Sequence, residues 1–465
     1  MAVRLSFHGG AGTVTGSKYL LDTGTSRVLI DAGLFQGLKK LRLLNWRPSP
    51  FPPESVDAVL LTHAHIDHGG YLPRLVRLGF DNPVYTTPAS MDLATLLLLD
   101  AAKIQEEDAA FANRKGYSKH RPALPLYTTE DAVAACELMQ PVPFGEWLQV
   151  REDVRARFLN MGHILGSSMI EVHVTQGGKR ARLVFSGDVG RYDVPLHSNP
   201  DNLPDCDYLT IESTYGDRVH NHETVEQQIR DALIRAVERE GTILIPSFAV
   251  GRTQLVTLSL RNLINEGRLP EVPIHIDSPM AVDATRLYTK HIKDLSIDAT
   301  VTEDGRSRLF PNNVHFHRSV RESKALNRMP GPRVVISASG MLTAGRVLHH
   351  LARLLPDPQN LVTLVGYQAA GTRGRAMIEG AESIKIHGQE IPVRAEFIAL
   401  SGLSAHADRN ELLRWAQSGE STPGTIFVTH GEEKSQQALA QLLSGETGAQ
   451  CITPELDEEV QIRLS

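Results

Sequence analysis

Cysteine is scarce in this 465-residue chain, and its positions form no pattern. Cys136, Cys206 and Cys451 lie far apart, with no paired spacing. A disulfide framework requires several cysteines at regular spacings, and a thiolate metal site requires closely spaced pairs. The sequence indicates neither, and we expect a protein of the reducing cytoplasm.

Long hydrophobic runs are also absent. The first ten residues contain no apolar signal core, and the richest apolar run, residues 93–99, ends at Asp100. Export requires an apolar core near the N-terminus, and a membrane-spanning helix requires about 20 apolar residues in a row. We therefore expect neither export nor membrane anchoring.

Charge of one sign and aromatic residues are not abundant either. The formal net charge of −6 argues against indiscriminate binding to nucleic acid but leaves a local basic lining open. Aromatic residues make up 6% of the chain, so no platform for stacking bases is evident, although scattered aromatics do not exclude one. The remaining composition is typical of a soluble globular protein, and the length predicts two domains.

One stretch carries a dense set of metal-binding side chains. An apolar run over residues 56–61 leads into His63, His65, Asp67 and His68. The run predicts a buried strand, after which His63 and His65 point the same way, while Asp67 and His68 lie in the following turn and can face a second centre. Chance would produce H-x-H-x-D-H about once in a thousand proteins of this length, so the pattern favours metal binding. It is the signature of the metallo-β-lactamase fold, and the chain resembles that superfamily.

Three more positions follow predicted strands and fit the same site. Asp31 either orients a histidine ligand or caps a turn before Gly33. His163 lies among glycines, and Asp188 lies in a Ser-Gly-Asp turn, as the third and fourth motifs of the resemblance require. Alone, each would as readily be a turn residue. Beside the H-x-H-x-D-H cluster, we expect both to be metal ligands.

The middle of the chain has a different pattern. Between residues 214 and 396, strands alternate with helices, which predicts a parallel α/β sheet with right-handed crossovers. This segment carries 23 Lys and Arg against 20 Asp and Glu, a net charge of +3. Residues 397–408 and 425–432 then predict two further strands of the first domain, each ending in a histidine. We predict a first domain of residues 1–213 and 397–465, interrupted by a second domain over 214–396.

The strand ends of that middle segment carry groups that suit phosphate. Hydroxyls, glycine N–H groups and helix N-termini are what phosphate oxygens require. Ordinary helix capping is the alternative for the hydroxyls, and ordinary solvation is the alternative for the basic side chains. The predicted phosphate contacts are Ser247, Arg252, Ser278, Ser339, Thr372 and Arg373.

The order of the motifs is similar to that of the β-CASP family of nucleases. Glu212 matches the acid of motif A, His406 in Ser-Ala-His-Ala-Asp matches motif B, and His430 in Thr-His-Gly-Glu matches motif C. The resemblance implies an α/β fold, a metallo-β-lactamase αββα sandwich with an inserted parallel α/β β-CASP domain. A histidine at motif C is associated with RNA-acting members, whereas the DNA-acting branch usually has valine. About 35 residues follow His430, so we expect the minimal two-domain bacterial form, similar to the nuclease subunit of the pre-mRNA 3′-end cleavage complex.

Seven histidine and aspartate side chains are the expected ligands of a dinuclear metal centre. One ion is assigned to His63, His65 and His163, the other to Asp67, His68 and His430, and Asp188 bridges them. Imidazole and carboxylate ligands without thiolate favour two zinc ions, with manganese open. A hydroxide shared between the ions is the expected nucleophile.

Four residues are expected to be catalytic: His406, Glu212, Asp67 and Asp31. The resemblance implies that His406, held by Glu212, is the general acid that protonates the leaving ribose oxygen. A structural histidine that bonds Asp408 or the backbone is the alternative.

Together these residues predict a metal-dependent ribonuclease that hydrolyses phosphodiester bonds, mainly in single-stranded RNA. The resemblance does not settle endonuclease against exonuclease; we expect endonucleolytic cleavage, with 5′ exonuclease action and a homodimer left open. Because most contacts would go to phosphate and sugar, we expect low sequence specificity. The alternatives are a metallohydrolase of small phosphodiesters or esters, and a scaffold that binds RNA without cutting it.

Overall fold

The computed structural model describes residues 2–116, 118, 120–220, 222–296, 313–366, 368, 371–400 and 404–465. The chain forms two compact units, and both are assembled from separate stretches. The first unit comprises Met1–Val194, Ser198–Val219 and His406–Ser465. The second comprises Pro195–His197 and His220–Ala405.

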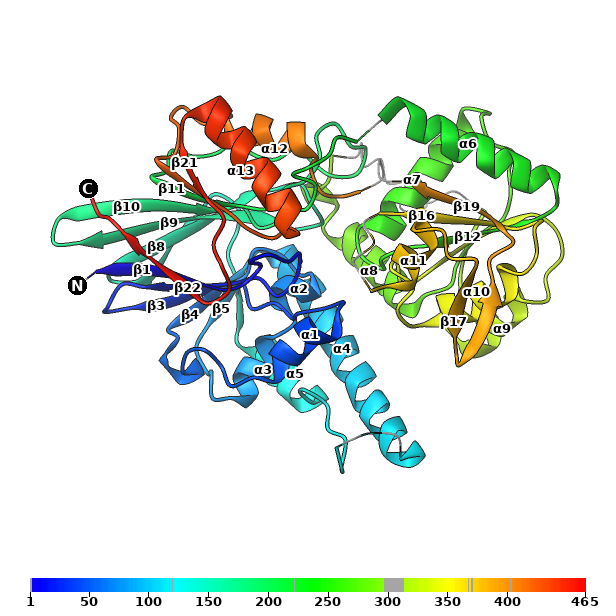
Figure 1. The fold of residues 1–465 in the computed structure, drawn as a ribbon, viewed down its shortest axis with the longest axis horizontal. Helices are drawn as coiled ribbons and strands as arrows, with labels where there is room; N and C mark the ends of the chain where they lie inside the picture. Colours follow the sequence, from blue (N-terminus) through cyan, green and yellow to red (C-terminus); the bar gives the residue numbers. More distant parts are fainter. Residues whose placement is uncertain are drawn as a thin grey trace. The chain divides into compact units, whose positions relative to one another are not determined.

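Two seven-stranded sheets stack face to face in the first unit (Figure 1). The first sheet has the order β22-β1-β2-β3-β4-β5-β6, formed by β22 (Glu458–Ile462), β1 (Val3–Gly9), β2 (Lys18–Asp22), β3 (Arg27–Ile30), β4 (Ala58–Leu60), β5 (Val84–Thr86) and β6 (Met139–Pro141). The second has the order β21-β20-β11-β10-β9-β8-β7, formed by β21 (Gln450–Ile452), β20 (Thr425–Val428), β11 (Tyr208–Ile211), β10 (Lys179–Phe185), β9 (Ser168–Gln176), β8 (Val154–Asn160) and β7 (Trp147–Arg151). Both sheets are mixed, with an antiparallel part and a parallel part.

Helices lie outside the two sheets, with α3, α4 and α5 beside the first sheet and α12 and α13 beside the second (Figure 1). The helices of this unit are α1 (Lys39–Arg42), α2 (Ile66–Gly69), α3 (Leu72–Arg77), α4 (Pro88–Lys115), α5 (Thr129–Glu137), α12 (Arg409–Ala416) and α13 (Glu433–Thr447), with short 3₁₀ turns at Leu43–Trp46 and Pro53–Ser55. No helix within the described ranges is long and apolar enough to cross a lipid bilayer.

Apolar residues on the facing sides of the two sheets form the main core. Phe7 on β1, Phe158 on β8 and Phe427 on β20 belong to one buried cluster. Along β8, buried residues alternate with partly buried ones, as expected of a strand that packs through one face. On the other face of the second sheet, Trp415 of α12 and Leu439 of α13 belong to a separate buried cluster. The layers therefore follow the order helix, sheet, sheet, helix.

The second unit contains a six-stranded sheet in which every neighbouring pair is parallel. Its order is β14-β13-β15-β12-β16-β19, formed by β14 (Val314–Phe316), β13 (Ile274–Ile276), β15 (Arg333–Ser337), β12 (Thr242–Pro246), β16 (Leu361–Val365) and β19 (Glu396–Leu400). Among its described residues, the unit also contains a hairpin of β17 (Ser383–Ile386) and β18 (Gln389–Pro392), a 3₁₀ turn at Ile292–Asp294, and the helices α6 (His222–Glu238), α7 (Arg252–Asn265), α8 (Pro279–Lys290), α9 (Val320–Leu326), α10 (Arg346–Leu354) and α11 (Arg373–Ile378). Successive residues Ile243 and Leu244 on β12 enter different buried clusters, so apolar side chains cover both faces of this sheet.

The return to the first unit comes later in the chain than the sequence analysis expected. We assigned residues 397–408 to a strand of the first domain, but β19 pairs in register with β16 of the second sheet. Residues 401–403 of that stretch lie outside the described residues, and the first unit resumes at His406. An apolar strand ending in a histidine carries no signal for which of two sheets it joins, because both sheets offer a parallel neighbour.

The core between the stacked sheets provides a test of how the first unit is stabilised. The ring of Phe427 is fully buried and lies 5.2 Å from the ring of Phe7, centre to centre. We expect Phe427→Ala to lower the free energy of unfolding by about 3–5 kcal/mol, because it leaves a cavity between the sheets. Denaturant unfolding followed by circular dichroism measures this. Leu43→Ala, at a side chain that is 55% exposed, is the control, and an equal loss in both variants would contradict the packing described here.

Candidate metal centre

The predicted ligands gather at one edge of the first unit. Parallel strands place their carboxyl ends at a common edge of a sheet, where loops meet. Asp31 follows β3, His63 and His65 follow β4, and Asp67 and His68 lie on α2. The loops after β8, β10, β11 and β20 contribute His163, Asp188, Glu212 and His430, and the segment before α12 contributes His406. The structure therefore brings together every predicted metal-binding and catalytic side chain.

Four of these side chains surround one point. His65 Nδ1 lies 3.1 Å from His63 Nε2 and 3.2 Å from His163 Nε2. Asp188 Oδ2 lies 3.4 Å from His63 Nε2 and 3.3 Å from His163 Nε2. Zinc bound at about 2.0–2.1 Å by four tetrahedral ligands requires spacings of roughly 3.3 Å between them. These four atoms already have that spacing, so they fit a tetrahedral metal ion.

The histidines of this group are in the form that binds metal. Burial, the largest cause, lowers the pKa of His63 to about 3 and the pKa of His65 to about 4. Burial also lowers the pKa of His163 well below its ordinary value. A neutral imidazole presents a lone pair, and these lone pairs converge on the same point.

A second group of ligand atoms lies beside the first. His68 Nε2 is 3.1 Å from His430 Nε2 and 3.1 Å from Asp188 Oδ1. Asp67 Oδ2 is 3.7 Å from His430 Nε2. Asp188 thus directs one carboxylate oxygen toward each group, which is the arrangement that a bridging ligand needs.

The electrostatic balance of the site calls for a cation. Asp31, Asp188 and Glu212 are each at most 2% exposed, and no Lys or Arg in the described part of the chain forms a salt bridge with them. Although burial opposes its charge, Asp188 and Asp31 raise the pKa of His68 well above its ordinary value. Buried carboxylates are costly unless a positive charge compensates them, and here only histidines do so among the described residues. The site therefore attracts a proton or a metal ion.

Asp31 and Thr62 hold the second group in place. Asp31 Oδ2 lies 2.7 Å from His68 Nδ1, which leaves His68 Nε2 directed at the second group. Thr62 donates its backbone N–H and its hydroxyl to Asp31 and also contacts His63 Nδ1. No role was predicted for Thr62 from the sequence. Its only signal was a hydroxyl between the strand and the first histidine, which is common at strand ends.

Two positions in the site have backbone angles that side chains rarely adopt. The φ angle is +59° at Asp31 and +46° at His430. Backbone hydrogen bonds hold both: Asp31 N–H donates to Leu60 O, and His430 N–H donates to Gly10 O at 2.6 Å. Such strain persists where the surrounding structure enforces it and clusters at functional sites.

His406 and Glu212 form a pair next to the predicted metal ligands. His406 Nδ1 lies 3.1 Å from Glu212 Oε1, and the ring of His406 lies 4.5 Å from the ring of His163, centre to centre. Glu212 also accepts the backbone N–H groups of Val189 and Thr214. Although burial opposes the charge, the Glu212 and Asp188 carboxylates raise the pKa of His406. A protonated histidine at this place can donate a proton.

The predicted phosphate contacts lie at strand ends and helix starts of the second unit, and several already have partners. Ser278 and Thr372 accept the N–H groups of Ala281 and Arg375 as helix N-caps, the alternative stated above. Arg373 donates to the backbone oxygens of Lys385, Leu342 and Thr343, and the Ser339 hydroxyl lies within hydrogen-bond distance of the Thr343 hydroxyl. Ser247 and Arg252 are buried. These contacts are structural, and binding of phosphate at these six residues stays a prediction.

The fold and the site together define a metal-dependent hydrolase. The chain matches the model of the metallo-beta-lactamase superfamily over residues 11–246, the Beta-Casp domain over 253–377, and the Zn-dependent metallo-hydrolase RNA specificity domain over 390–454. The chain therefore belongs to the β-CASP family of the metallo-β-lactamase superfamily. This confirms the predicted family and fold class, and it confirms that the protein is a metal-dependent hydrolase.

Relatives of known name match nearly the whole chain. Ribonuclease TTHA0252 of Thermus thermophilus is 40% identical and covers 95% of this chain and 96% of its own length. Transcription termination factor FttA of Methanocaldococcus jannaschii is 31% identical over 93% of this chain and 67% of its own length. A crystal structure of a protein of unknown function from Enterococcus faecalis V583 shares the fold, with a TM-score of 0.54 and 13% identity over 99% of this chain and 100% of that chain.

The shared position of Asp188 predicts how metal content responds to substitution. Asp188 contacts both groups of ligand atoms, whereas His163 contacts only the first. We expect His163→Ala to lose about half of the bound metal and Asp188→Ala to lose more than half. Metal analysis of the purified protein by mass spectrometry measures this. Asp81→Ala, an exposed aspartate, is the control, and retention of full metal by Asp188→Ala would contradict the assignment.

Proposed function

We propose that this β-CASP ribonuclease cuts single-stranded RNA internally and uses two zinc ions that share Asp188. The observation that carries the proposal is the pair of ligand groups on either side of Asp188, with the pair His406 and Glu212 alongside. Action on RNA is also supported by the match to an RNA specificity domain and by the relative named as a ribonuclease.

In this proposal each of the two groups of converging side chains holds one ion. His63, His65 and His163 would hold one ion, Asp67, His68 and His430 the other, with Asp188 between them. When bound, zinc ions supply a water molecule of lowered pKa and positive charge opposite the phosphate. Asp31 and Thr62 keep His68 and His63 in the orientation that directs their free nitrogens into the site.

His406 acts as the general acid in this proposal. Its Nδ1 bonds Glu212, so the ring can present its other nitrogen to the reacting phosphate and donate a proton to the leaving ribose oxygen. The Glu212 carboxylate favours the protonated ring, and Val189 and Thr214 fix that carboxylate with their N–H groups.

RNA would be held through its backbone. The six phosphate contacts proposed on the second unit are serine, threonine and arginine side chains, which bind phosphate without reading bases. We therefore propose low sequence specificity and affinity that falls steeply with salt. A homodimer is compatible with this proposal, which does not need one.

A substrate with a good leaving group distinguishes the role of the general acid from the role of the metal ligands. We expect His406→Ala at full metal content to cut RNA about 10²–10⁴-fold more slowly, because the leaving oxygen is no longer protonated. The same variant should hydrolyse bis-p-nitrophenyl phosphate close to the wild-type rate, because p-nitrophenolate leaves without a proton. Asp188→Ala should lose both activities. Equal losses of His406→Ala on both substrates would contradict the role of His406.

Circular RNA tests the mode of cleavage. A circular single strand has no end, so only an endonuclease can open it. We expect the wild type to cut circular and linear RNA of one sequence at similar rates, as measured by gel electrophoresis of internally labelled RNA. Release of mononucleotides from linear RNA with the circle intact would instead assign a 5′ exonuclease.

A further inference from the structure

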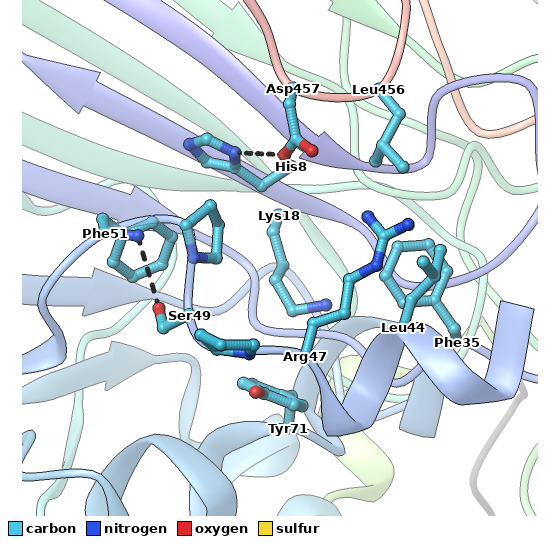
Figure 2. A pocket seen from close by; sticks show the side chains of 12 residues that line it. His8, Lys18, Phe35, Leu44, Arg47, Ser49, Phe51, Tyr71, Leu456 and Asp457 are labelled. Carbon is cyan, nitrogen blue, oxygen red and sulfur yellow. Dashed lines mark hydrogen bonds and ion pairs between the residues drawn. The ribbon is translucent and has the colours of Figure 1, made fainter.

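A pocket of about 260 Å³ lies in the first unit, apart from the metal ligands. Its wall includes His8 at the end of β1, Lys18 at the start of β2, the loop that carries Arg47 and Phe51, and Asp457 before β22. Figure 2 shows these side chains around the opening. Pockets for drug-sized molecules measure roughly 300–1,000 Å³, so this one suits a single small unit.

Lys18 is the unusual residue of the pocket. It is only 5% exposed, and its Nζ lies 4.6 Å from the centre of the Phe35 ring and 4.7 Å from the centre of the Tyr71 ring. The ammonium donates to Gly16 O at 3.2 Å. Burial lowers the pKa of Lys18 to about 7, against the opposing effect of the Asp457 carboxylate. A buried amine held at a pocket wall is a position where an anion would be stabilised.

The other charges of the pocket leave an excess of positive charge. Asp457 already pairs with His8, at 2.9 Å. Arg47 is exposed, and its guanidinium has no hydrogen bond or ion pair within the described part of the chain. Arg47 and Lys18 therefore offer donors to an anionic group such as a phosphate.

The rest of the wall is apolar and partly aromatic. Phe51 is 5% exposed and packs beside His8, with ring centres 5.3 Å apart, so the exposed apolar lining on this side is formed by Pro48, Pro50 and Leu456. Flat apolar and aromatic surfaces are what nucleobases pack against. The pocket thus combines a site for a phosphate with a site for a base.

The pocket adjoins the metal centre through the backbone. Ser17, next to Lys18 in the chain, donates its N–H to Asp67 O and accepts the N–H of Gly33. Tyr71, which lies three residues after His68, donates its N–H to Ala32 O. Two lining residues of the pocket, Lys18 and Tyr71, therefore lie on segments joined by backbone hydrogen bonds to those that carry Asp31, Asp67 and His68.

We propose that the pocket binds one nucleotide, with its phosphate held by Lys18 and Arg47 and its base packed against the exposed side chains of Pro48, Pro50 and Leu456. The nucleotide is either part of an RNA strand that reaches the metal centre or a free nucleoside monophosphate. If the nucleotide is part of an RNA strand, this inference rests on the proposed ribonuclease function; if it is a free nucleoside monophosphate, it does not.

Calorimetric titration of the metal-loaded protein with AMP tests the pocket. We expect AMP to bind, and Arg47→Gln and Lys18→Met each to weaken its affinity about tenfold, as the loss of one charged hydrogen bond predicts. Arg42→Gln, an exposed arginine on α1, is the matched control and should bind AMP as the wild type does. Because Arg47 is exposed, its variant keeps the test valid if Lys18→Met fails to fold. Binding of AMP that is lost in Asp188→Ala but unchanged in Arg47→Gln would overturn the proposal, as would the absence of any binding.

The Michaelis constant for RNA distinguishes the two sources. If the pocket holds part of the RNA strand, KM rises about tenfold in Arg47→Gln relative to Arg42→Gln, in parallel with the affinity for AMP. If it takes only free nucleotides, the affinity for AMP falls while KM stays constant. If the protein binds AMP but does not cut RNA, the proposed ribonuclease function is refuted and the proposed nucleotide pocket stands. If the protein cuts RNA but Arg47→Gln and Lys18→Met bind AMP as the wild type does, only the proposed nucleotide pocket is refuted.

Discussion

The site depends on a buried carboxylate that is shared between two groups of histidines. Asp188 is 2% exposed, and the described residues offer it only histidines as partners of opposite charge. Burial alone would raise its pKa, but the surrounding imidazoles hold the pKa of Asp188 well below its ordinary value. A charge buried in this way is stable only beside cations. The predicted ligands of both groups surround this carboxylate.

The sandwich brings the predicted ligands to one edge by aligning strand ends. Alignment alone does not place the side chains, because several positions also need unusual backbone conformations. Asp31 and His430 adopt positive φ angles, each at a cost of about 1–3 kcal/mol. Gly33 is required for a related reason, because a Cβ there would lie 1.7 Å from Asp67 O. The backbone is thus forced close together around α2, and the packed core between the sheets has to offset this strain.

That the histidine and aspartate side chains of the site lie together could be predicted from the sequence because their signals are local. His63, His65, Asp67 and His68 lie within six residues, and the other ligands each follow a recognisable strand. The prediction that was wrong concerned a partner rather than a residue type, because the apolar sequence of β19 fits either sheet. For Ser278 and Thr372 the sequence left helix capping and phosphate binding open, because the capping bonds depend on where the helices begin. The pocket could not be predicted at all, because His8, Lys18, Arg47, Phe51 and Asp457 share no spacing along the chain.

One loop links the metal centre and the pocket, and this determines how they can be separated. In the loop between β1 and β2, Gly10 accepts the His430 N–H and Ser17 donates to Asp67 O, so the loop contacts a ligand from each end of the chain. Lys18 follows directly. A change in this loop would shift ligands and pocket together, since packed segments transmit displacement. Arg47 belongs to a different loop and has no bond to this one within the described residues, so it is the side chain through which the pocket can be altered while the ligand geometry is preserved.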